Sequence, residues 1–408
     1  MPDPSTSVYV GGNLHWQQLW ENEGSVVVDG NMEVATFNHW TFLAGKVMWG
    51  MGFQPPANAD MVNVGGDVYD NNTNITGVGG NTRIGGAYHA PANNGSQMFI
   101  TTQENLQKTG ASDRLVNTYP YPDQQNATIK TNLGKTAALK VDTTGNNDII
   151  DFNDYTRKTL IPLSDKLAAL KNTGTVSYTK APDVTDYSHR DIGINPYTNY
   201  QPDGNGGLNI ENEGKIVFTG DGQQNKQVFT VDLTKAESAA ASLKTNGSWS
   251  LDFENIPDGQ PIIINVTGKS DVTWIPGWRI WVNGVNYSTY INDFGQSWSR
   301  YRSIASRIMW NYANVSKLMI TGASDAGKMD LDTGTKLRGA GSNNGLVQFP
   351  GSILIPRGEL GTQATTNGRL LIGKDLTLNT LEHHNAPWIG FDEPQCFAVS
   401  GRTEATLG

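Results

Sequence analysis

Cysteine, charge and long apolar runs are all scarce in this sequence of 408 residues. The single cysteine, Cys396, excludes a disulfide within the chain. No apolar run reaches the roughly 18 residues that a membrane-spanning helix needs, so we expect no membrane insertion by this segment. Charged residues make up only 17% of the chain, and the formal net charge is −9. Because an acidic surface repels the phosphate backbone and no Lys or Arg run offsets it, nucleic acid is excluded as a partner.

Targeting signals are missing from both ends. Residues 1–7 lack the apolar core of a signal peptide, and residues 401–408 carry no sorting motif or hydrophobic tail. A surface protein needs such signals. We therefore expect the mature part of a longer protein, acting as a monomer within a larger wall-anchored protein. An intact cytosolic protein is the alternative.

Glycine and other turn residues are abundant, and they punctuate short strand-like segments. Gly24–Val34 and Gly368–Leu378 share one pattern: Gly, a polar residue, three aliphatics, two turn residues, Asn or Asp, then alternation. Shorter versions occur at Tyr9–Leu14, Asn63–Val68 and Gly77–Asn81. Repeated short strands with Gly corners are typical of solenoids, in which each coil needs its neighbours. The pattern predicts a mainly β fold, specifically a right-handed β-solenoid (β-helix); ordinary hairpins are the alternative.

One segment predicts a helix. Within Asp151–Lys171 the apolar residues recur at helical steps, with Asp151 as the N-cap, Gly174 at the end and Pro162 as a kink. The apolar positions are Phe152, Tyr155, Leu160, Leu163, Leu167 and Leu170. We expect this one amphipathic helix to cover the flank of the solenoid.

The other segments divide into loops and strands. We expect long loop insertions at residues 54–60, 119–125 and 172–209. Further strands are predicted at Lys215–Phe218, Gln227–Asp232 and Pro261–Val266.

Four segments, in order, resemble those of a known family. Glu23–Asn31, Arg307–Ala313, Gly351–Pro356 and Leu381–Gly390 are similar to sequence motifs of the choice-of-anchor A domain of bacterial surface proteins, and the resemblance spans about residues 8–397. It implies an extracellular adhesive module with an ice-binding-like β-helix and a flanking helix. It implies no particular ligand.

Aromatic residues are the strongest indication of a binding site. They gather in an aromatic-rich insertion at residues 270–312, where exposed rings would bind sugar faces or peptide side chains. Our candidate ligand-binding residues are Trp274, Trp278, Trp281, Tyr287, Trp298 and Tyr301. The alternative is that these rings fill the core, as Trp usually does.

Acidic clusters make calcium a candidate cofactor. Asp148, Asp151 and Asp154 form one cluster and Asp325, Asp330 and Asp332 another, although neither follows the twelve-residue calcium loop. Helix capping and a solvated loop are the competing explanations. No other cofactor is predicted, and the metal site stays unknown.

Two further motifs could take part in chemistry, but we predict a chemical role for neither. His383 and His384 are adjacent, so on a strand they point to opposite sides and favour a structural role over a shared metal. Cys396 follows Gln395, and a Cys–Gln pair can form an internal thioester in some adhesins. Adjacent residues do not readily close the thioester ring, so an inert thiol is favoured.

We therefore expect one adhesive domain over residues 1–408, on the surface of a Gram-positive bacterium, that binds a host or matrix glycan or protein and is not an enzyme. A polysaccharide-active enzyme on a β-helix scaffold is the alternative, and it would need a row of carboxylates on one face. A stalk would repeat more simply, and an ice-binding face would need Thr rows in register.

Overall fold

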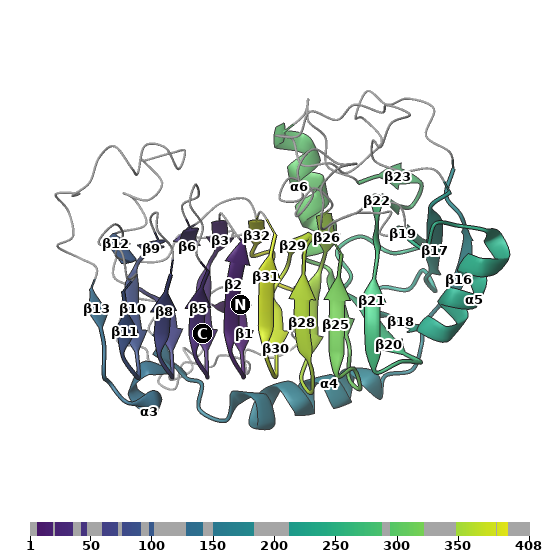
Figure 1. The fold of residues 1–408 in the computed structure, drawn as a ribbon. Helices are drawn as coiled ribbons and strands as arrows, with labels where there is room; N and C mark the ends of the chain where they lie inside the picture. The colour runs from purple at the N-terminus through teal and green to yellow at the C-terminus, as the bar shows by residue number, and fades with distance from the viewer. Residues whose placement is uncertain are drawn as a thin grey trace, which may run out of the picture.

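Most strands of the protein belong to three parallel sheets. The computed structural model (Figure 1) describes residues 6–18, 21–35, 42–46, 59–71, 76–90, 98–101, 128–141, 150–182, 212–287, 294–321, 348–380 and 382–390. Within them, ten strands form the first sheet, eight the second and seven the third. The prediction of a mainly β protein is confirmed.

The bounds of these strands are as follows. The first sheet contains β1 (Thr6–Val10), β4 (Ser25–Val28), β7 (Asp60–Val64), β10 (Asn81–Ile84), β13 (Ile129–Lys130), β18 (Gln227–Asp232), β20 (Ile262–Thr267), β24 (Ile308–Asn311), β27 (Ser352–Ile355) and β30 (Leu370–Ile372). The second contains β2 (Leu14–Gln18), β5 (Met32–Val34), β8 (Val68–Asp70), β11 (Tyr88–His89), β21 (Asp271–Trp274), β25 (Lys317–Ile320), β28 (Glu359–Thr362) and β31 (Leu376–Asn379). The third contains β3 (Glu21–Glu23), β6 (Phe42–Lys46), β9 (Thr76–Gly79), β12 (Met98–Thr101), β26 (Gln348–Pro350), β29 (Thr365–Asn367) and β32 (Glu382–His384).

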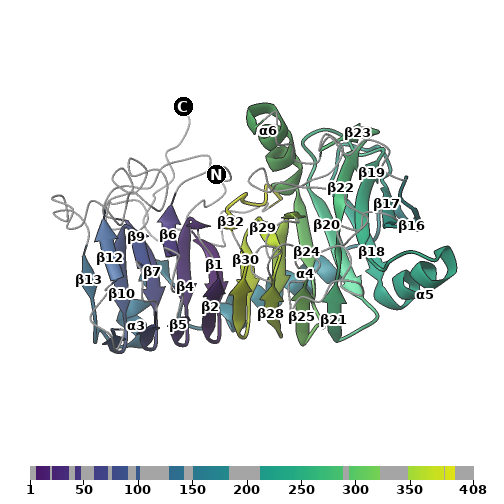
Figure 2. The ribbon, with the colours of Figure 1, turned by 45° about the horizontal axis from the view of Figure 1, so that its top comes forward.

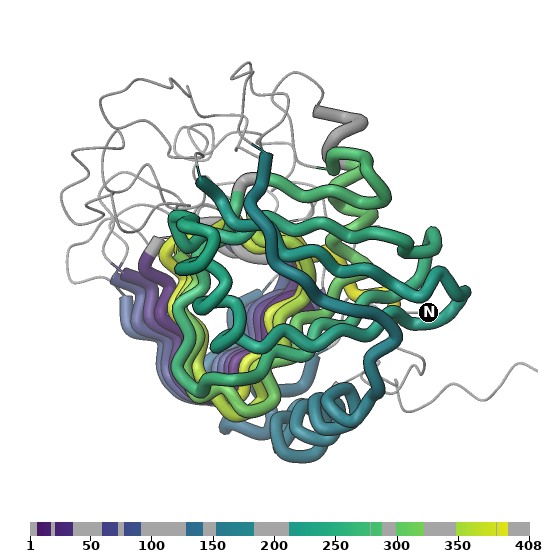
Figure 3. The backbone as a smooth tube through the Cα atoms, turned by 90° about the vertical axis from the view of Figure 1, so that its right-hand side faces the viewer, coloured from purple at the N-terminus to yellow at the C-terminus, as the bar shows by residue number. Residues whose placement is uncertain are grey.

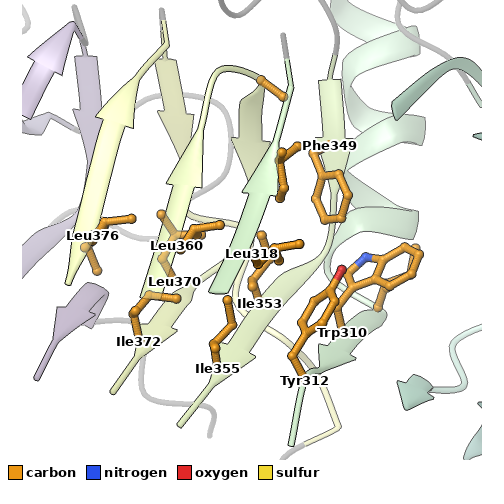
Figure 4. Packing of buried hydrophobic residues seen from close by; sticks show 14 of the residues in the cluster. Trp310, Tyr312, Leu318, Phe349, Ile353, Ile355, Leu360, Leu370, Ile372 and Leu376 are labelled. Carbon is orange, nitrogen blue, oxygen red and sulfur yellow. The ribbon is translucent and has the colours of Figure 1, made fainter. Parts of the chain in front are cut away.

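Consecutive strands visit the three sheets in turn. A triplet such as β1, β2 and β3 places one strand in each sheet, and the next triplet, β4 to β6, pairs with it strand by strand in parallel. Each sheet therefore grows by one strand per triplet. The side chains between the sheets stack into rows, as Figure 4 shows for Leu360, Leu376 and their neighbours.

The first and last triplets meet in the middle of the stack. β1 pairs with β30, β2 with β31 and β3 with β32, all in parallel. In the first sheet the order runs β13-β10-β7-β4-β1-β30-β27-β24-β20-β18, so the chain extends from the centre to one end and then returns to the centre from the other. Figure 1 shows this as purple strands beside yellow ones.

The first sheet is buried on both faces, which explains its runs of three aliphatic residues. Val26 and Val28 face the interior, while Val27 belongs to a second apolar cluster on the outer face with Tyr9 and Leu371. A strand with only one buried face would alternate apolar and polar residues instead. The repeated aliphatic run predicted strands correctly, and the structure supplies its physical cause.

Glycine corners join the first sheet to the second, and each has a steric reason. Asn31 accepts a hydrogen bond at Oδ1 from the backbone N–H of Asp67 (2.8 Å) in the next triplet, and Asn13 accepts one from Asn31 (2.9 Å). A Cβ on Gly66 would overlap Asn31 Oδ1, and one on Gly30 would overlap Asn13 Oδ1. The Gly-Asn and Gly-Asp pattern is thus a ladder between triplets.

A helix covers the outer face of the first sheet, as predicted, although its bounds differ. A π-helical turn (η2, Thr156–Leu160) leads into α4 (Ile161–Ala168), and the change of helix type falls just before Pro162. Figure 1 shows this helix lying along the stack, across several strands. Asp151 does not cap it, because Asp151 lies in β15 (Ile150–Asp151), which pairs with β14 (Lys140–Val141). Gly174 does not end it either, since α4 stops at Ala168.

The prediction of a single helix is wrong. The described residues also contain α3 (Lys135–Ala138), α5 (Leu233–Leu243) and α6 (Phe294–Ala305). Asp232 caps α5 by accepting from the N–H groups of Thr234 (3.0 Å) and Lys235 (3.3 Å). That capping residue before an Ala-rich run was a readable helix signal.

A separate five-stranded sheet closes one end of the stack. Its order is β16 (Thr175–Lys180), β17 (Gly214–Thr219), β19 (Trp249–Glu254), β22 (Pro276–Val282) and β23 (Val285–Asn286). Figure 2 shows it at one end of the stack, and Figure 3 shows it in front of the stacked triplets. Its inner residues, such as Phe218 and Phe253, join the main core, with ring centroids 4.9 Å apart.

Several predicted loops can be compared with these bounds. The segment 172–209 contains strand β16, so it is not wholly a loop. Residues 54–58, 119–125 and 183–209 lie outside the described residues. The aromatic-rich insertion 270–312 is bounded by ordinary members of the stack, β21 and β24, with β22, β23 and α6 between them.

Candidate ligand pocket

A small pocket lies where the five-stranded sheet meets α6 and the edge of the third sheet. Four aromatic side chains line it: Trp249 of β19, Trp274 of β21, Tyr301 of α6 and Phe349 of β26. Its open volume is about 20 Å³, which is room for about one water molecule. We call it the aromatic pocket.

The aromatic walls are fixed by packing. The rings of Trp274 and Trp310 meet edge to face with centroids 5.2 Å apart, and Trp310 and Phe349 lie 5.3 Å apart (Figure 4). Trp310 Nε1 donates to the carbonyl of Pro350 (2.8 Å). Rings held in this way keep their orientation, so the pocket is pre-formed.

One wall of the pocket ends a chain of hydrogen bonds between buried side chains. Asn367 Nδ2 donates to Gln348 Oε1 (2.9 Å), and Asn367 Oδ1 lies 2.7 Å from His384 Nδ1. His384 Nε2 lies 3.2 Å from Glu382 Oε2. Burial alone would lower the pKa of His384, but the hydrogen bond and charge of Glu382, with Glu23 and Glu21 beyond, raise it above its usual value. A raised pKa favours the protonated ring, whose charge faces Glu382.

Gln348, at the pocket end of this chain, has an unused donor. The residue is only 6% exposed, and its Nε2 has no hydrogen-bond partner among the described residues. Tyr301 stands beside this chain, 3.5 Å from Asn367 Nδ2, and burial raises the pKa of its hydroxyl well above the usual value. Tyr301 therefore stays protonated.

Another residue of the lining, Arg279, belongs to a buried ion pair. Arg279 of β22 donates to Glu213 Oε2 from Nε (3.2 Å) and Nη2 (3.0 Å), and to the carbonyl of Pro182. Ser250 Oγ donates to the same carboxylate oxygen (2.9 Å). Both charges are thus satisfied inside the protein, and Arg279 is not a free cation for a ligand.

Arg279 connects the pocket to the outer face of the five-stranded sheet. Its guanidinium lies 5.2 Å from the centre of the Trp281 ring, and Lys215 Nζ lies 5.4 Å from it. Lys215 also pairs with Asp252 at 2.7 Å. Trp281 is half-buried, so part of its ring faces solvent beside charged hydrogen-bonding groups.

The predicted binding residues fall into three groups. Trp274 and Tyr301 are each only 2% exposed, so they line the pocket instead of forming the expected exposed platform. Tyr287 directly follows β23, and Trp281 lies in the neighbouring strand β22. The hairpin turn next to it is Asn283–Gly284, both with positive φ, as a two-residue turn of this kind requires.

Trp278 and Trp298 form the third group. Their backbones lie in β22 and α6, and their side chains are outside the described part of the structure. Ligand binding by these six residues stays a prediction.

Comparison with known proteins supports an adhesive module. A family model described as "Putative Ice-binding-like adhesive domain" matches residues 5–385. The chain belongs to this family. No curated protein and no solved structure matches the chain. The family agrees with the adhesive character predicted from the sequence, while the narrower choice-of-anchor A assignment stays a prediction.

Within this adhesive domain, Asp154 is the member of the two acidic clusters whose side-chain contacts are described, and those contacts are structural. Asp154 pairs with Arg157 (2.8 Å) and Lys158 (3.5 Å), and the hydrogen bond and charge of Arg157 lower the pKa of Asp154. The described residues contain no group of three His, Cys, Asp or Glu side chains that could hold a metal. Asp148, Asp325, Asp330 and Asp332 lie outside them, so calcium stays an untested candidate.

The histidine pair ties the closing strand of the adhesive domain to its neighbours. His383 Nε2 lies 2.7 Å from Ser7 Oγ and its Nδ1 lies 2.7 Å from Thr366 Oγ1, while His384 belongs to the chain that ends at Gln348. The two rings have different partners, as expected for adjacent strand residues. Cys396 lies outside the described residues.

Two residues of the pocket, Gln348 and Arg279, were not predicted from the sequence. A lone glutamine at the start of a strand carries no pattern that marks it as a buried donor. Arg279 had a weak signal, because a charge inside the apolar strand Pro276–Val282 implies a buried partner.

Among the described helices of the adhesive domain, none is long and apolar enough to cross a membrane.

Proposed function

We propose that the protein is an extracellular adhesive domain of a bacterial cell-surface protein, which binds a host or matrix glycan or protein. The observation that carries this proposal is the half-buried Trp281 ring beside Lys215 and Arg279 on the outer face of the five-stranded sheet, in a chain that belongs to an adhesive-domain family. Fixed aromatic rings supply large contact area at little entropic cost, and nearby polar groups supply orientation.

The glycan is the ligand that this site favours. Trp281 offers a partly exposed ring face, and Lys215 and Asp252 next to it offer donors and acceptors for hydroxyl groups. A sugar presents both an apolar C–H face and a rim of hydroxyls, so it matches this combination.

We also infer that the strand triplets are the coils of a β-solenoid, related to the choice-of-anchor A domains that the sequence resembles. Parallel pairing of each triplet with the next, and the ladder of Asn31 and Asp67 between them, support this architecture. A solenoid presents long flat faces, which suits a protein that contacts a surface.

The test is a glycan and matrix-protein array, with and without chelator. The purified chain should bind at least one glycan class, and Trp281→Ala should weaken that binding by about tenfold or more while its thermal melt stays close to wild type. Tyr69→Ala, an exposed ring on the second sheet, is the matched control and should bind normally. Loss of binding only with chelator would make calcium part of the site. Depolymerisation of a bound polysaccharide would favour the enzyme alternative.

A further inference from the structure

The outer face of the second sheet carries a straight row of side chains. His89 of β11, Tyr69 of β8, Glu33 of β5 and His15 of β2 are successive parallel partners, so they stand beside one another on neighbouring strands. Figure 1 shows these four strands side by side, on a different side of the stack from α4. Tyr69 is 38% exposed, and the Glu33 side chain is 52% exposed. Rings occupy the first, second and fourth places of this ring row, and a carboxylate occupies the third.

The two rings at one end of the ring row are fixed. Tyr69 and His89 stack with centroids 4.5 Å apart and 5° between their planes. This separation is close to the roughly 4.8 Å between neighbouring strands, so the ring planes face along the row. Asp67 Oδ2 accepts from the Tyr69 hydroxyl (3.2 Å) and lies 3.3 Å from His89 Nε2. His89 therefore covers one face of the Tyr69 ring, and the other face is turned toward Glu33.

Glu33 gives the third place of the ring row a negative charge. Its Oε2 lies 3.2 Å from His15 Nδ1, whereas its Oε1 has no hydrogen-bond partner among the described residues. The ring row contains no Lys or Arg, and Asp67 adds a second carboxylate beside Tyr69. The face of an aromatic ring is itself negative and attracts cations. A cation over Glu33 would therefore meet a carboxylate below it and a ring face beside it.

The geometry of the ring row favours a guanidinium over an ammonium. A guanidinium is planar, so it can stack on Tyr69 and still direct two N–H groups at the Glu33 carboxylate. It is also more weakly hydrated than an ammonium, which is compact and has no face to stack. A neutral planar group could stack in the same way, but it would leave the charge of Glu33 without a counter-charge.

We propose that the ring row binds an arginine side chain of a protein partner. The guanidinium lies over Glu33, stacks on the face of Tyr69 that is turned toward Glu33, and has His15 on its other side. This site is on the second sheet and Trp281 is on the five-stranded sheet, so the inference adds a protein contact to the proposed glycan-binding function. The formal net charge of −9 also suits a basic partner.

The test is an NMR titration of the full chain with a capped pentapeptide that carries one arginine between glycines. The chain has 6 histidines, and the variants His15→Gln and His89→Gln assign the two ring signals of interest. Matched peptides at the same ionic strength carry lysine, which keeps the charge, or citrulline, which keeps the plane. We expect the arginine peptide to shift the His15 signal and to bind at least about threefold more tightly than either analogue.

Two variants remove the two halves of the site. Glu33→Gln removes the charge and Tyr69→Leu removes the ring, and both side chains are exposed, so folding should be retained. Each should weaken the arginine peptide by at least about threefold. Glu359→Gln is the matched control, because it removes the same charge from an exposed glutamate on β28 of the same sheet. It should leave the preference for arginine unchanged.

Three outcomes would overturn the inference. Equal affinity for the arginine and lysine peptides would show only a diffuse attraction to an acidic protein. Equal weakening by Glu33→Gln and Glu359→Gln would show the same. A titration that leaves the His15 and His89 signals in place would exclude the ring row as the site. Failure of every glycan on the array would sink the glycan-binding proposal and leave this site standing, because the two lie on different sheets.

Discussion

At the scale of single residues, the protein keeps several charges and amides inside, and some of the charges form buried ion pairs. Arg279 and Glu213 are the clearest case, with side chains 4% and 0% exposed. Sequence alone could not reveal them as a pair, because they are 66 positions apart and neither belongs to a recognised motif. Only the register of the five-stranded sheet brings them together.

Removing one partner of this ion pair should lower the stability of the protein. Arg279→Met leaves Glu213 buried without its counter-charge, and we expect the free energy of unfolding to fall by about 3–5 kcal/mol in urea titrations. The double variant Arg279→Met with Glu213→Gln should be more stable than Arg279→Met alone. A single variant within about 1 kcal/mol of wild type would show that the ion pair is solvated.

His383 should make the protein sensitive to acid. Burial, with the charge of His384, lowers the pKa of His383 to about 3, against about 6.5 in an unfolded chain. The folded state therefore binds fewer protons, so this stabilisation is present above pH 6.5 and is lost as the pH falls toward 3.

The variant His383→Gln isolates this effect. Between pH 6 and 4 its unfolding free energy should fall less steeply than that of wild type, by about 1.4 kcal/mol per pH unit. His384 has a raised pKa, so its contribution is already complete in this window and does not change the comparison. Equal slopes in chemical denaturation at pH 4, 5 and 6 would contradict a neutral buried His383.

At the scale of elements, local sequence patterns predicted strands better than they predicted helices. Val26–Val28 and Leu370–Ile372 are consecutive aliphatic runs, and both are strands of the doubly buried first sheet. Helix α4 could be predicted from the sequence, because its apolar residues recur at helical spacing and face that sheet. The helix α6 was not predicted, because its segment was assigned as a whole to the aromatic-rich insertion 270–312.

The glycine corners give a prediction at this scale. A Cβ on Gly66 would overlap both Asn31 Oδ1 and the carbonyl of Gly30, so Gly66→Ala should destabilise the protein by about 3 kcal/mol. Gly134→Ala is the control, since nothing lies within 4 Å of its Cβ and only its φ of 78° opposes the change. That variant should lose about 1 kcal/mol in the same thermal or urea unfolding experiment. A reversed order would contradict the ladder.

At the scale of the whole molecule, the first and last strand triplets of the chain lie side by side. The repeats predicted that triplets stack, but not that the first triplet would lie beside the last. Strand pairing between residues more than 350 positions apart leaves no local signal, because only the matching of side-chain rows selects it. The pocket shares this origin, since its walls come from β19, β21, α6 and β26.

An engineered disulfide tests this arrangement. His15 and Thr377 are parallel partners on the outer face of the second sheet. In a Cys396→Ser background, His15→Cys with Thr377→Cys should cross-link and shift the band on a non-reducing gel, because neighbouring strands hold their Cα atoms within disulfide reach. The pair His15→Cys with His89→Cys is separated by two intervening strands and should stay reduced. Cross-linking of the second pair alone would contradict the strand order.

The most direct measurement of the ligand site is a crystal structure of the protein with the glycan that binds best on the array. We predict a sugar ring against the Trp281 side chain, with a hydroxyl group about 3 Å from Lys215 Nζ or from an Asp252 carboxylate oxygen. A sugar bound elsewhere on the molecule, with the surroundings of Trp281 unchanged, would contradict the assignment of this face as the binding site.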